Sequence, residues 1–198
     1  MLDLSNKKYC IFDIECFEDV DGKRNQFNQA QHLGIAVACT LSSDGEYKDW
    51  IGRHHSPHAL FSYLLSHDIV VGYNVLGFDF PLLGGELLGE YDLKAPKYVE
   101  LMLKGKIVDL CVDFREALGT RVSLVKVAEP TLGEQKTMDG GFAPQEFRRG
   151  HCLEVIRYCR QDLNMTKGLF LKSAAGEELK VQATNGSVKT FTCVPKVR

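Results

Sequence analysis

Residues 9–16 read YCIFDIEC, an apolar run whose second half contains Asp13 and Glu15. Aromatic and β-branched residues in so short a run predict a buried strand over Tyr9–Ile14. Because successive side chains of a strand point to opposite faces, residues two apart share a face. Asp13 and Glu15 therefore leave the end of this strand from the same face.

The rest of the chain supplies strands and helices in an order that predicts an α/β fold. Further strands are expected at His32–Leu41, Glu46–Ile51, Asp68–Tyr73 and Lys106–Leu110, with a hairpin turn at Ser42–Gly45. Helices are expected from Ser56-Pro57, from about Phe80 to Leu88, over Asp113–Leu118 and over His151–Phe170, whose apolar stripe includes Leu153. Loops are expected at Asp19–Gln31 and Met138–Gly141, and residues 120–150 also hold short helical pieces. This order predicts a mixed β-sheet covered by helices.

A different composition begins after Phe170. Leu179–Thr184 and Lys189–Val194 flank Asn185-Gly186, a dipeptide typical of β-hairpin turns. We predict a main domain over residues 1–172 and a C-terminal β-hairpin appendage over residues 173–198. Three roles for this hairpin stay open, namely packing on the main domain, substrate binding and dimerisation. The oligomeric state stays open with them.

The composition of the 198 residues is that of a globular protein, with 44% apolar and 25% charged residues. These fractions exclude a disordered chain, a collagen-like repeat and a coiled coil. No apolar run reaches the ~18 residues of a transmembrane helix, and the N-terminus lacks the basic-then-apolar order of a signal peptide. We therefore expect a cytoplasmic protein with no membrane partner. The seven cysteines form no C-x-x-C pair, which favours reduced thiols over a disulfide or zinc site.

The net charge of −2 lacks the basic excess of a protein that coats nucleic acid nonspecifically. A neutral sum can nevertheless hide a local concentration of charge. If four carboxylates belong to a metal site, 24 basic residues face 22 remaining acidic ones, and the rest of the surface is mildly basic.

Four carboxylates occupy positions that an α/β fold would bring together. Asp13 and Glu15 end a strand. Asp79 stands at the turn between a later strand and its helix, and Asp162 lies within the last helix. Two unit charges ~4 Å apart repel by roughly 4 kcal/mol at an effective dielectric constant near 20, so such a cluster needs a cation. Carboxylates without histidine or cysteine suit Mg²⁺ or Mn²⁺, and two such ions ~3.5–4 Å apart can activate water for phosphodiester hydrolysis.

The last helix adds two hydroxyl groups to this set. Tyr158 precedes Asp162 by four positions and Thr166 follows it by four, so all three lie on one helix face. With an ordinary pKa of ~10, the Tyr158 phenol is better suited to orient an attacking water than to deprotonate it.

These motifs resemble those of the DEDD (DnaQ-like) 3′–5′ exonuclease superfamily, which includes the proofreading domains of DNA polymerases. Its three motifs correspond to Asp13-Ile14-Glu15, to VVGYNVLGFDFPLL at residues 70–83, and to YCRQD at residues 158–162. One branch of the superfamily has histidine five positions before the last aspartate, where this chain has Arg157; the DEDDy branch has tyrosine four positions before it, as here. Residues 9–170 further resemble bacterial and phage RNase H-like exonuclease domains, some of them associated with helicases.

The resemblance implies an RNase H-like fold and hydrolysis from a 3′ end that releases nucleoside 5′-monophosphates. It implies that two Mg²⁺ or Mn²⁺ ions are held by Asp13, Glu15, Asp79 and Asp162, with Tyr158 positioning the water. It also implies that the substrate meets the backbone near Ile14 and Cys16 and the side chains of Asn74 and Phe78. Thr166 completes the substrate-binding set that we predict.

Several of these residues also have a structural interpretation. Asp79 could cap the helix that follows it, and Asn74 could be only a turn residue. Tyr158 could be a core tyrosine, and Thr166 suits the surface as well as the site. Of the two phenylalanines that flank Asp79, at least one is expected in the core, and the other could stack on a base. Asp109 suits a structural role better than direct ligation.

The function that these motifs predict is metal-dependent 3′–5′ exonuclease activity on single-stranded or frayed nucleic acid. Single-stranded DNA is the favoured substrate, with RNA as the second, and a helicase or polymerase partner is suggested by analogy alone. Two other functions stay open, a catalytically weak RNase H-like nucleic-acid-binding or assembly module and a structure-specific endonuclease. All five catalytic positions are filled, which favours the exonuclease.

Overall fold

The computed structural model describes residues 1–19, 29–52, 54–134, 141, 143–183 and 186–198. One sheet is formed by β1 (Tyr9–Cys16), β2 (Ile35–Ser42), β3 (Tyr47–Ile51), β4 (Ile69–Gly72) and β5 (Ile107–Asp109). The strand order across this sheet is β3-β2-β1-β4-β5. β1 pairs antiparallel with β2 and parallel with β4. The predicted mixed sheet is therefore confirmed, with β1 as its central strand.

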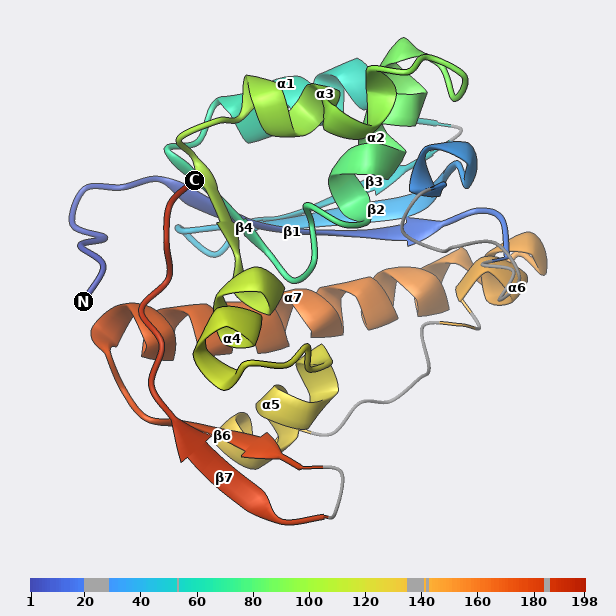
Figure 1. Ribbon diagram of the computed structural model, residues 1–198. Coiled ribbons are helices and arrows are strands. Elements are labelled where there is room, and N and C mark those ends of the chain that lie inside the picture. The colour runs from blue at the N-terminus through green and yellow to red at the C-terminus, as the bar shows by residue number, and fades with distance from the viewer. Residues whose placement is uncertain (20–28, 53, 135–140, 142, 184–185) are drawn as a thin grey trace.

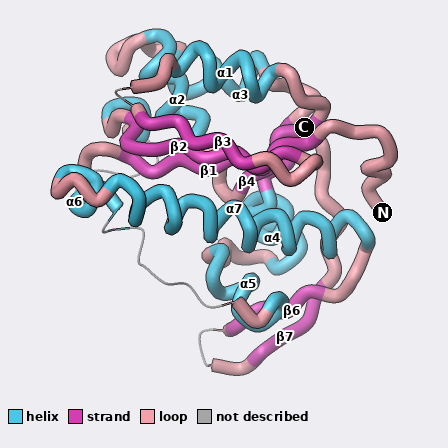
Figure 2. The backbone as a smooth tube through the Cα atoms, turned by 180° about the vertical axis from the view of Figure 1, so that it is seen from behind, coloured by secondary structure: helices cyan, strands magenta, loops and turns pink. Residues whose placement is uncertain are grey.

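Helices cover both faces of this sheet, as Figure 1 shows. One face carries α1 (Pro57–Leu65), α2 (Asp79–Leu88) and α3 (Ala95–Met102). The other carries α4 (Leu110–Leu118), α5 (Leu124–Leu132) and the long α7 (Cys152–Ala175), which packs along β1 and β2 (Figure 2). Short helices are η1 (Ala30–His32) and α6 (Ala143–Arg148), and a second sheet pairs β6 (Leu179–Gln182) with β7 (Val188–Phe191). The α/β class with a C-terminal hairpin is as predicted.

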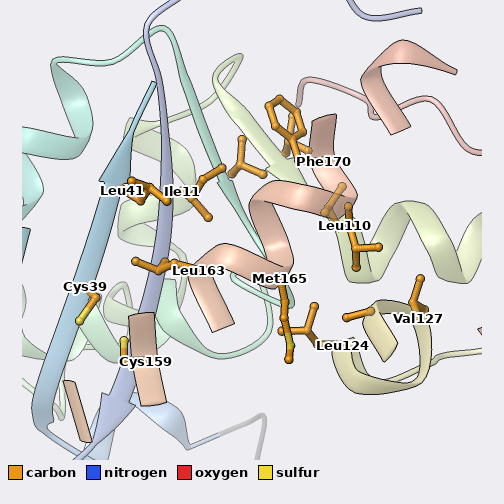
Figure 3. Packing of buried hydrophobic residues seen from close by; sticks show 14 of the residues in the cluster. Ile11, Cys39, Leu41, Leu110, Leu124, Val127, Cys159, Leu163, Met165 and Phe170 are labelled. Carbon is orange, nitrogen blue, oxygen red and sulfur yellow. The ribbon is translucent and has the colours of Figure 1, made fainter. Parts of the chain in front are cut away.

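Alternation along β1 divides its side chains between two hydrophobic cores. Tyr9 and Ile11 belong to a core shared with α4, α5 and α7, whereas Phe12 and its even-numbered neighbours belong to a core shared with α1, α2 and α3. Figure 3 shows Ile11 among the side chains of the first of these cores. By the same alternation, Asp13 and Glu15 lie on the face that α7 covers.

The last helix of the main domain is longer than predicted. It was expected over His151–Phe170 but ends at Ala175, where Gly176 adopts the left-handed conformation with φ 75° that glycine tolerates best. α7 therefore runs through the boundary that we predicted between residues 172 and 173. The stripe prediction was wrong at Leu153, whose side chain is 67% exposed because the first turn of α7 directs it away from the core.

The C-terminal hairpin contacts the main domain at several points. Thr131 of α5 and Lys180 of β6 exchange two hydrogen bonds, each of 2.9 Å, through the Thr131 hydroxyl. Phe191 of β7 packs edge-on against Phe114 of α4, with ring centroids 5.4 Å apart. The chain then returns to the central sheet, where the Arg198 backbone N–H donates to a carbonyl of β5 at 2.8 Å. These contacts join the hairpin and the chain end to both α4 and β5.

Helix α4 begins earlier than predicted, for a local reason. α4 begins at Leu110, three residues early, because the Asp109 carboxylate accepts hydrogen bonds from two backbone N–H groups of its first turn. Three parts of the predictions lie outside the residues that the structure describes: residues 20–28 of the loop predicted at Asp19–Gln31, residues 138–140 of the loop predicted at Met138–Gly141, and residues 184–185 of the hairpin.

Two global predictions concern cysteines and membranes. The seven cysteines are free thiols, in agreement with the prediction of reduced cysteines. Within the described ranges, no helix has both the length and the apolarity needed to cross a membrane.

Two helical glycines make contrasting tests of how tightly the helices pack. A Cβ added at Gly84 of α2 would lie 1.9 Å from the carbonyl oxygen of Ala95, whereas one added at Gly168 of α7 would meet a methyl group of Leu132 at 2.9 Å. The Ala95 backbone cannot shift away from an added methyl group, whereas the end of the flexible Leu132 side chain can. Gly84→Ala should lower the free energy of unfolding by about 1–3 kcal/mol, despite alanine's higher helix propensity.

Gly168→Ala is the matched control and should stay within about 1 kcal/mol of wild type, since a gain in helix propensity offsets a small shift of Leu132. Urea unfolding followed by circular dichroism measures both variants. Equal stability of the two would contradict the close backbone packing of α2 on α3.

Candidate functional site

Two carboxylates of β1 and a thiol of α7 form a compact group. A ligand-type atom from each of Asp13, Glu15 and Cys159 lies within 4.8 Å of the other two. Glu15 and Cys159 are buried, and Asp13 is half-buried. Two carboxylates so close repel one another by a few kcal/mol at the dielectric of a protein surface, and a divalent cation would relieve that repulsion. The group is therefore a candidate metal site.

Asp79 joins this group from the first turn of α2. Its Oδ1 accepts a hydrogen bond of 2.8 Å from the backbone N–H of Ile14, the residue between the two β1 carboxylates. Burial raises the pKa of Asp79 well above its ordinary value, and the negative charge of Asp13 raises it further. Phe78 is the N-cap residue of α2, and Asp79 is the acidic residue of its first turn. The bond to Ile14 directs its carboxylate to the end of β1.

The face of α7 that was predicted to belong to the site is buried. Tyr158, Asp162 and Thr166 are all less than a tenth exposed. Burial raises the pKa of Tyr158, and the charges of Asp162, Glu15 and Asp13 raise it further, together with a hydrogen bond to Asp162. Because the negative charges of all three carboxylates disfavour the ionised phenol, the Tyr158 hydroxyl lies within electrostatic reach of each of them. It stays protonated near neutral pH and can act as a hydrogen-bonding group.

The structure thus places the five predicted catalytic residues around the C-terminal half of β1. They come from β1, the start of α2 and the middle of α7. The donor set fits a hard divalent cation, because the predicted ligands are all carboxylates. Their assignment as ligands of two ions stays a prediction.

Cys159 is a member of the group that the sequence analysis missed. Its thiol donates to Asp13, at 3.3 Å to Oδ2 and 3.6 Å to the backbone oxygen. Burial raises the pKa of the Cys159 thiol well above its ordinary value, and a hydrogen bond with Cys39 raises it further. Cys159 thus offers a sulfur atom beside the two carboxylates and also holds the Asp13 carboxylate by a hydrogen bond. Its position one residue after Tyr158 and three before Asp162 was the available signal.

Asp109 organises the loop that leads to Asp79. Its Oδ1 accepts from the backbone N–H of Asn74 at 2.8 Å and from that of Cys111 at 3.0 Å, and its Oδ2 accepts from Leu76 at 3.0 Å. The side chain is fully buried. Asn74 has a φ of 72°, which asparagine tolerates better than most residues. The predicted structural role of Asp109 is confirmed. Asn74 is a turn residue, as one of its two interpretations predicted.

The residues predicted to touch substrate lie around this centre in different environments. The side chains of Ile14 and Cys16 are buried in the core on the α2 side, and the Ile14 N–H is bonded to Asp79. Thr166 is buried, so the surface interpretation is wrong. Of the two phenylalanines, Phe80 is in the core and stacks on Phe12, whereas Phe78 is only partly buried. Contact of any of these residues with substrate stays a prediction.

Polar contacts of Arg160 hold α7 against β3, the edge strand of the sheet. Arg160 donates to both carboxylate oxygens of Asp49 on β3, at 2.9 and 2.6 Å. Its guanidinium also lies over the ring of Tyr47, 4.8 Å from the centroid. A bidentate pair with a stacked guanidinium fixes orientation as well as distance. Asp162 is therefore carried by a helix that is anchored next to it.

Comparison with known proteins supports the fold. No protein-family model matches this sequence, and no curated protein matches it either. A similar solved structure is the family B DNA polymerase from the hyperthermophilic archaeon Pyrobaculum calidifontis, with a TM-score of 0.62 and 22% sequence identity. The alignment covers 84% of this chain and 24% of the polymerase, so this chain spans about a quarter of that protein. At this identity the likeness shows a shared fold.

Neutralising one carboxylate of the acidic group should stabilise the metal-free protein and reduce its stabilisation by metal. Asp13→Asn should raise the free energy of unfolding in EDTA by about 1 kcal/mol or more, or roughly 2–4 °C in Tm, because it removes one of several repelling charges. Mn²⁺ should stabilise the wild type more than this variant. Thermal unfolding with Mn²⁺ or EDTA measures both effects.

The control for this prediction is Asp92→Asn, at an exposed aspartate between α2 and α3. It should unfold as the wild type does in both buffers. A destabilised Asp13→Asn in EDTA, with no response of the wild type to Mn²⁺, would refute the repelling cluster.

Asp109→Ala should destabilise the protein strongly. It leaves the amide groups of Asn74, Leu76 and Cys111 without their buried acceptor, at a cost of about 3 kcal/mol or more. Asp92→Ala removes an exposed carboxylate that accepts one bond, from the Lys94 N–H, and should cost about 1 kcal/mol or less. Urea unfolding compares the two, and similar losses would show that Asp109 does not organise the loop.

Proposed function

We propose that this chain is a metal-dependent 3′–5′ exonuclease of the DEDDy type. It hydrolyses phosphodiester bonds at the 3′ end of single-stranded or frayed nucleic acid and releases nucleoside 5′-monophosphates. The observation that carries the proposal is the meeting of Asp13, Glu15 and Asp79 at the end of β1, with Tyr158 and Asp162 of α7 within electrostatic reach. The order and spacing of the three sequence motifs support the same assignment.

In the proposed mechanism the carboxylates bind the cations, and a tyrosine of α7 orients the attacking water. Two Mg²⁺ or Mn²⁺ ions would be bound by Asp13, Glu15, Asp79 and Asp162. When bound, such ions supply a nucleophilic water at neutral pH and stabilise the leaving oxygen. The Tyr158 hydroxyl orients that water by a hydrogen bond, and Cys159 keeps the Asp13 carboxylate in position.

The substrate end is proposed to lie beside the loop that Asp109 organises. Phe78 is partly exposed at the start of α2 and would stack on a base, and Asn74 would contact the sugar or phosphate. Ile14 and Cys16 would contribute backbone atoms, and Thr166 would line the site from α7. Single-stranded DNA is the favoured substrate.

The polymerase with the shared fold is about four times as long as the aligned segment, so a polymerase or helicase partner is a proposal by analogy. We also propose residues 1–172 as the nuclease domain, with the hairpin of residues 173–198 packed on it. The contacts of α5 with β6 and of Phe114 with Phe191 support this arrangement.

The test is a nuclease assay on 5′-labelled single-stranded DNA and RNA with Mg²⁺, Mn²⁺ or EDTA. Wild type should give a ladder shortened from the 3′ end in one-nucleotide steps, and EDTA should abolish it. Asp13→Ala should lower the rate by roughly 100-fold or more, and Tyr158→Phe by about 10–100-fold without weakening Mn²⁺ binding. Asp92→Ala is the control and should cleave as the wild type does.

Two outcomes would contradict the proposal. Intact substrate in every lane, with protein that is folded and binds Mn²⁺, would indicate a nucleic-acid-binding or assembly module. Internal cuts without a ladder would indicate an endonuclease on the same fold.

A further inference from the structure

A basic cleft lies between the connection from α4 to α5, helix α5 and the C-terminal hairpin. It has a volume of about 310 Å³. Arg121, Lys126 and Lys189 line it, with the hydroxyl and amide groups of Thr120, Ser123 and Gln182. Among the described residues that line it, none is acidic. The cleft therefore offers cations and neutral hydrogen-bonding groups, which suits an anion.

The charge of the two segments that form this cleft differs from that of the whole chain. The connection and helix α5, residues 119–132, contain two basic residues and one acidic residue, and residues 179–198 contain four basic and no acidic residues. Lys196 and Arg198 are engaged with Glu116 and Asp113 of α4. By contrast, no salt bridge joins Lys126 or Lys189 to a described residue, and both side chains are exposed. These two lysines are accessible to a ligand.

A hydrogen bond links a wall of the cleft to the loop that leads to the candidate active site. The Tyr73 hydroxyl donates a hydrogen bond of 2.8 Å to the backbone oxygen of Val122, which is a wall of the cleft. Tyr73 immediately precedes Asn74, the first residue of the loop that leads to Asp79. The hairpin of β6 and β7 lies on the same side of the central sheet as α4, α5 and α7 (Figure 1). Tyr73 thus joins the wall of the cleft to the start of the loop that leads to Asp79.

We propose that this cleft binds the sugar-phosphate backbone of a single-stranded nucleic acid whose 3′ end lies in the active site. This inference rests on the proposed exonuclease function for the position of the 3′ end. Lys126 and Lys189 contact phosphates from different walls, α5 and β7, and Thr120, Ser123 and Gln182 donate hydrogen bonds to phosphate or sugar oxygens. Such contacts are independent of sequence. The hairpin is thus a substrate-binding element as well as a packing element.

An extended strand explains the cleft better than a single small anion. Lys126 on α5 and Lys189 on β7 line different walls of the cleft, and a strand with several phosphates can contact both lysines at once. A polyanion that contacts several cations releases several counterions, so its affinity falls steeply with salt. A single phosphate group shows little of this dependence. Chain length and salt therefore distinguish the two ligands.

The experiment measures binding of fluorescein-labelled oligothymidines of about 20 and about 3 nucleotides by anisotropy, in EDTA to prevent cleavage. The test variant is Lys126→Ala/Lys189→Ala. The control is Lys94→Ala/Lys104→Ala, which removes two exposed lysines at the ends of α3. The test variant should lose roughly tenfold or more in affinity for the long strand at low salt, and its salt slope should fall by about 1.4. The short strand should lose much less.

A second readout separates this inference from the proposed function. Hydrolysis of the p-nitrophenyl ester of thymidine 5′-monophosphate reports the active site alone, and the test variant should retain it. If the wild type hydrolyses nothing while the test variant still loses long-strand binding, the proposed exonuclease fails and the cleft stands as a nucleic-acid surface. Affinity and salt slope equal to those of the control variant would overturn the inference. Equal losses on the long and short strands would also overturn it.

Discussion

The alternation of side chains along β1 determines where the rest of the site must lie. The strand is buried between two apolar cores, and each core takes every second residue. Asp13 and Glu15 occupy two positions of the α7 face, so their carboxylates point to the same helix that carries Tyr158 and Asp162. Asp79 reaches the same strand from the other side of the sheet through its bond to the Ile14 N–H. One strand thus joins two layers of helices at a single group of charges.

Holding these charges together has a cost, and the surrounding structure offsets it. Asp109 fixes the loop before Asp79 through several backbone N–H groups. Arg160 and Asp49 fix α7 against β3, and the thiol of Cys159 orients Asp13. Each of these contacts positions an acidic group or the element that carries it. A protein whose only requirement was stability would gain by replacing one carboxylate of the group, and the proposed cation site accounts for their being retained together.

The sequence was informative where the pattern is local and periodic. The five strands of the sheet and helices α2 and α7 were predicted because apolar runs and helical stripes are properties of short segments. The convergence of Asp79 with β1 was predicted from the order of strands and helices. The contact of Cys159 with Asp13 and the bond of Asp109 to Asn74 were not, because they join residues 146 and 35 positions apart through side-chain geometry. The end of α7 was missed because the apolar stripe was followed only to Phe170, although residues 171–175 continue the helix until Gly176 ends it.

The hairpin contributes to a second surface beyond the central site, since its Lys189 and Lys126 of α5 line the same cleft. The proposed function depends on the binding of two divalent ions by the acidic group at the end of β1. Anomalous diffraction from crystals soaked in Mn²⁺ tests it most directly. Two peaks about 3.5–4 Å apart, bounded by Asp13, Glu15, Asp79 and Asp162, are the predicted result. The absence of any peak there, or one ion held by the Cys159 sulfur, would contradict the claim.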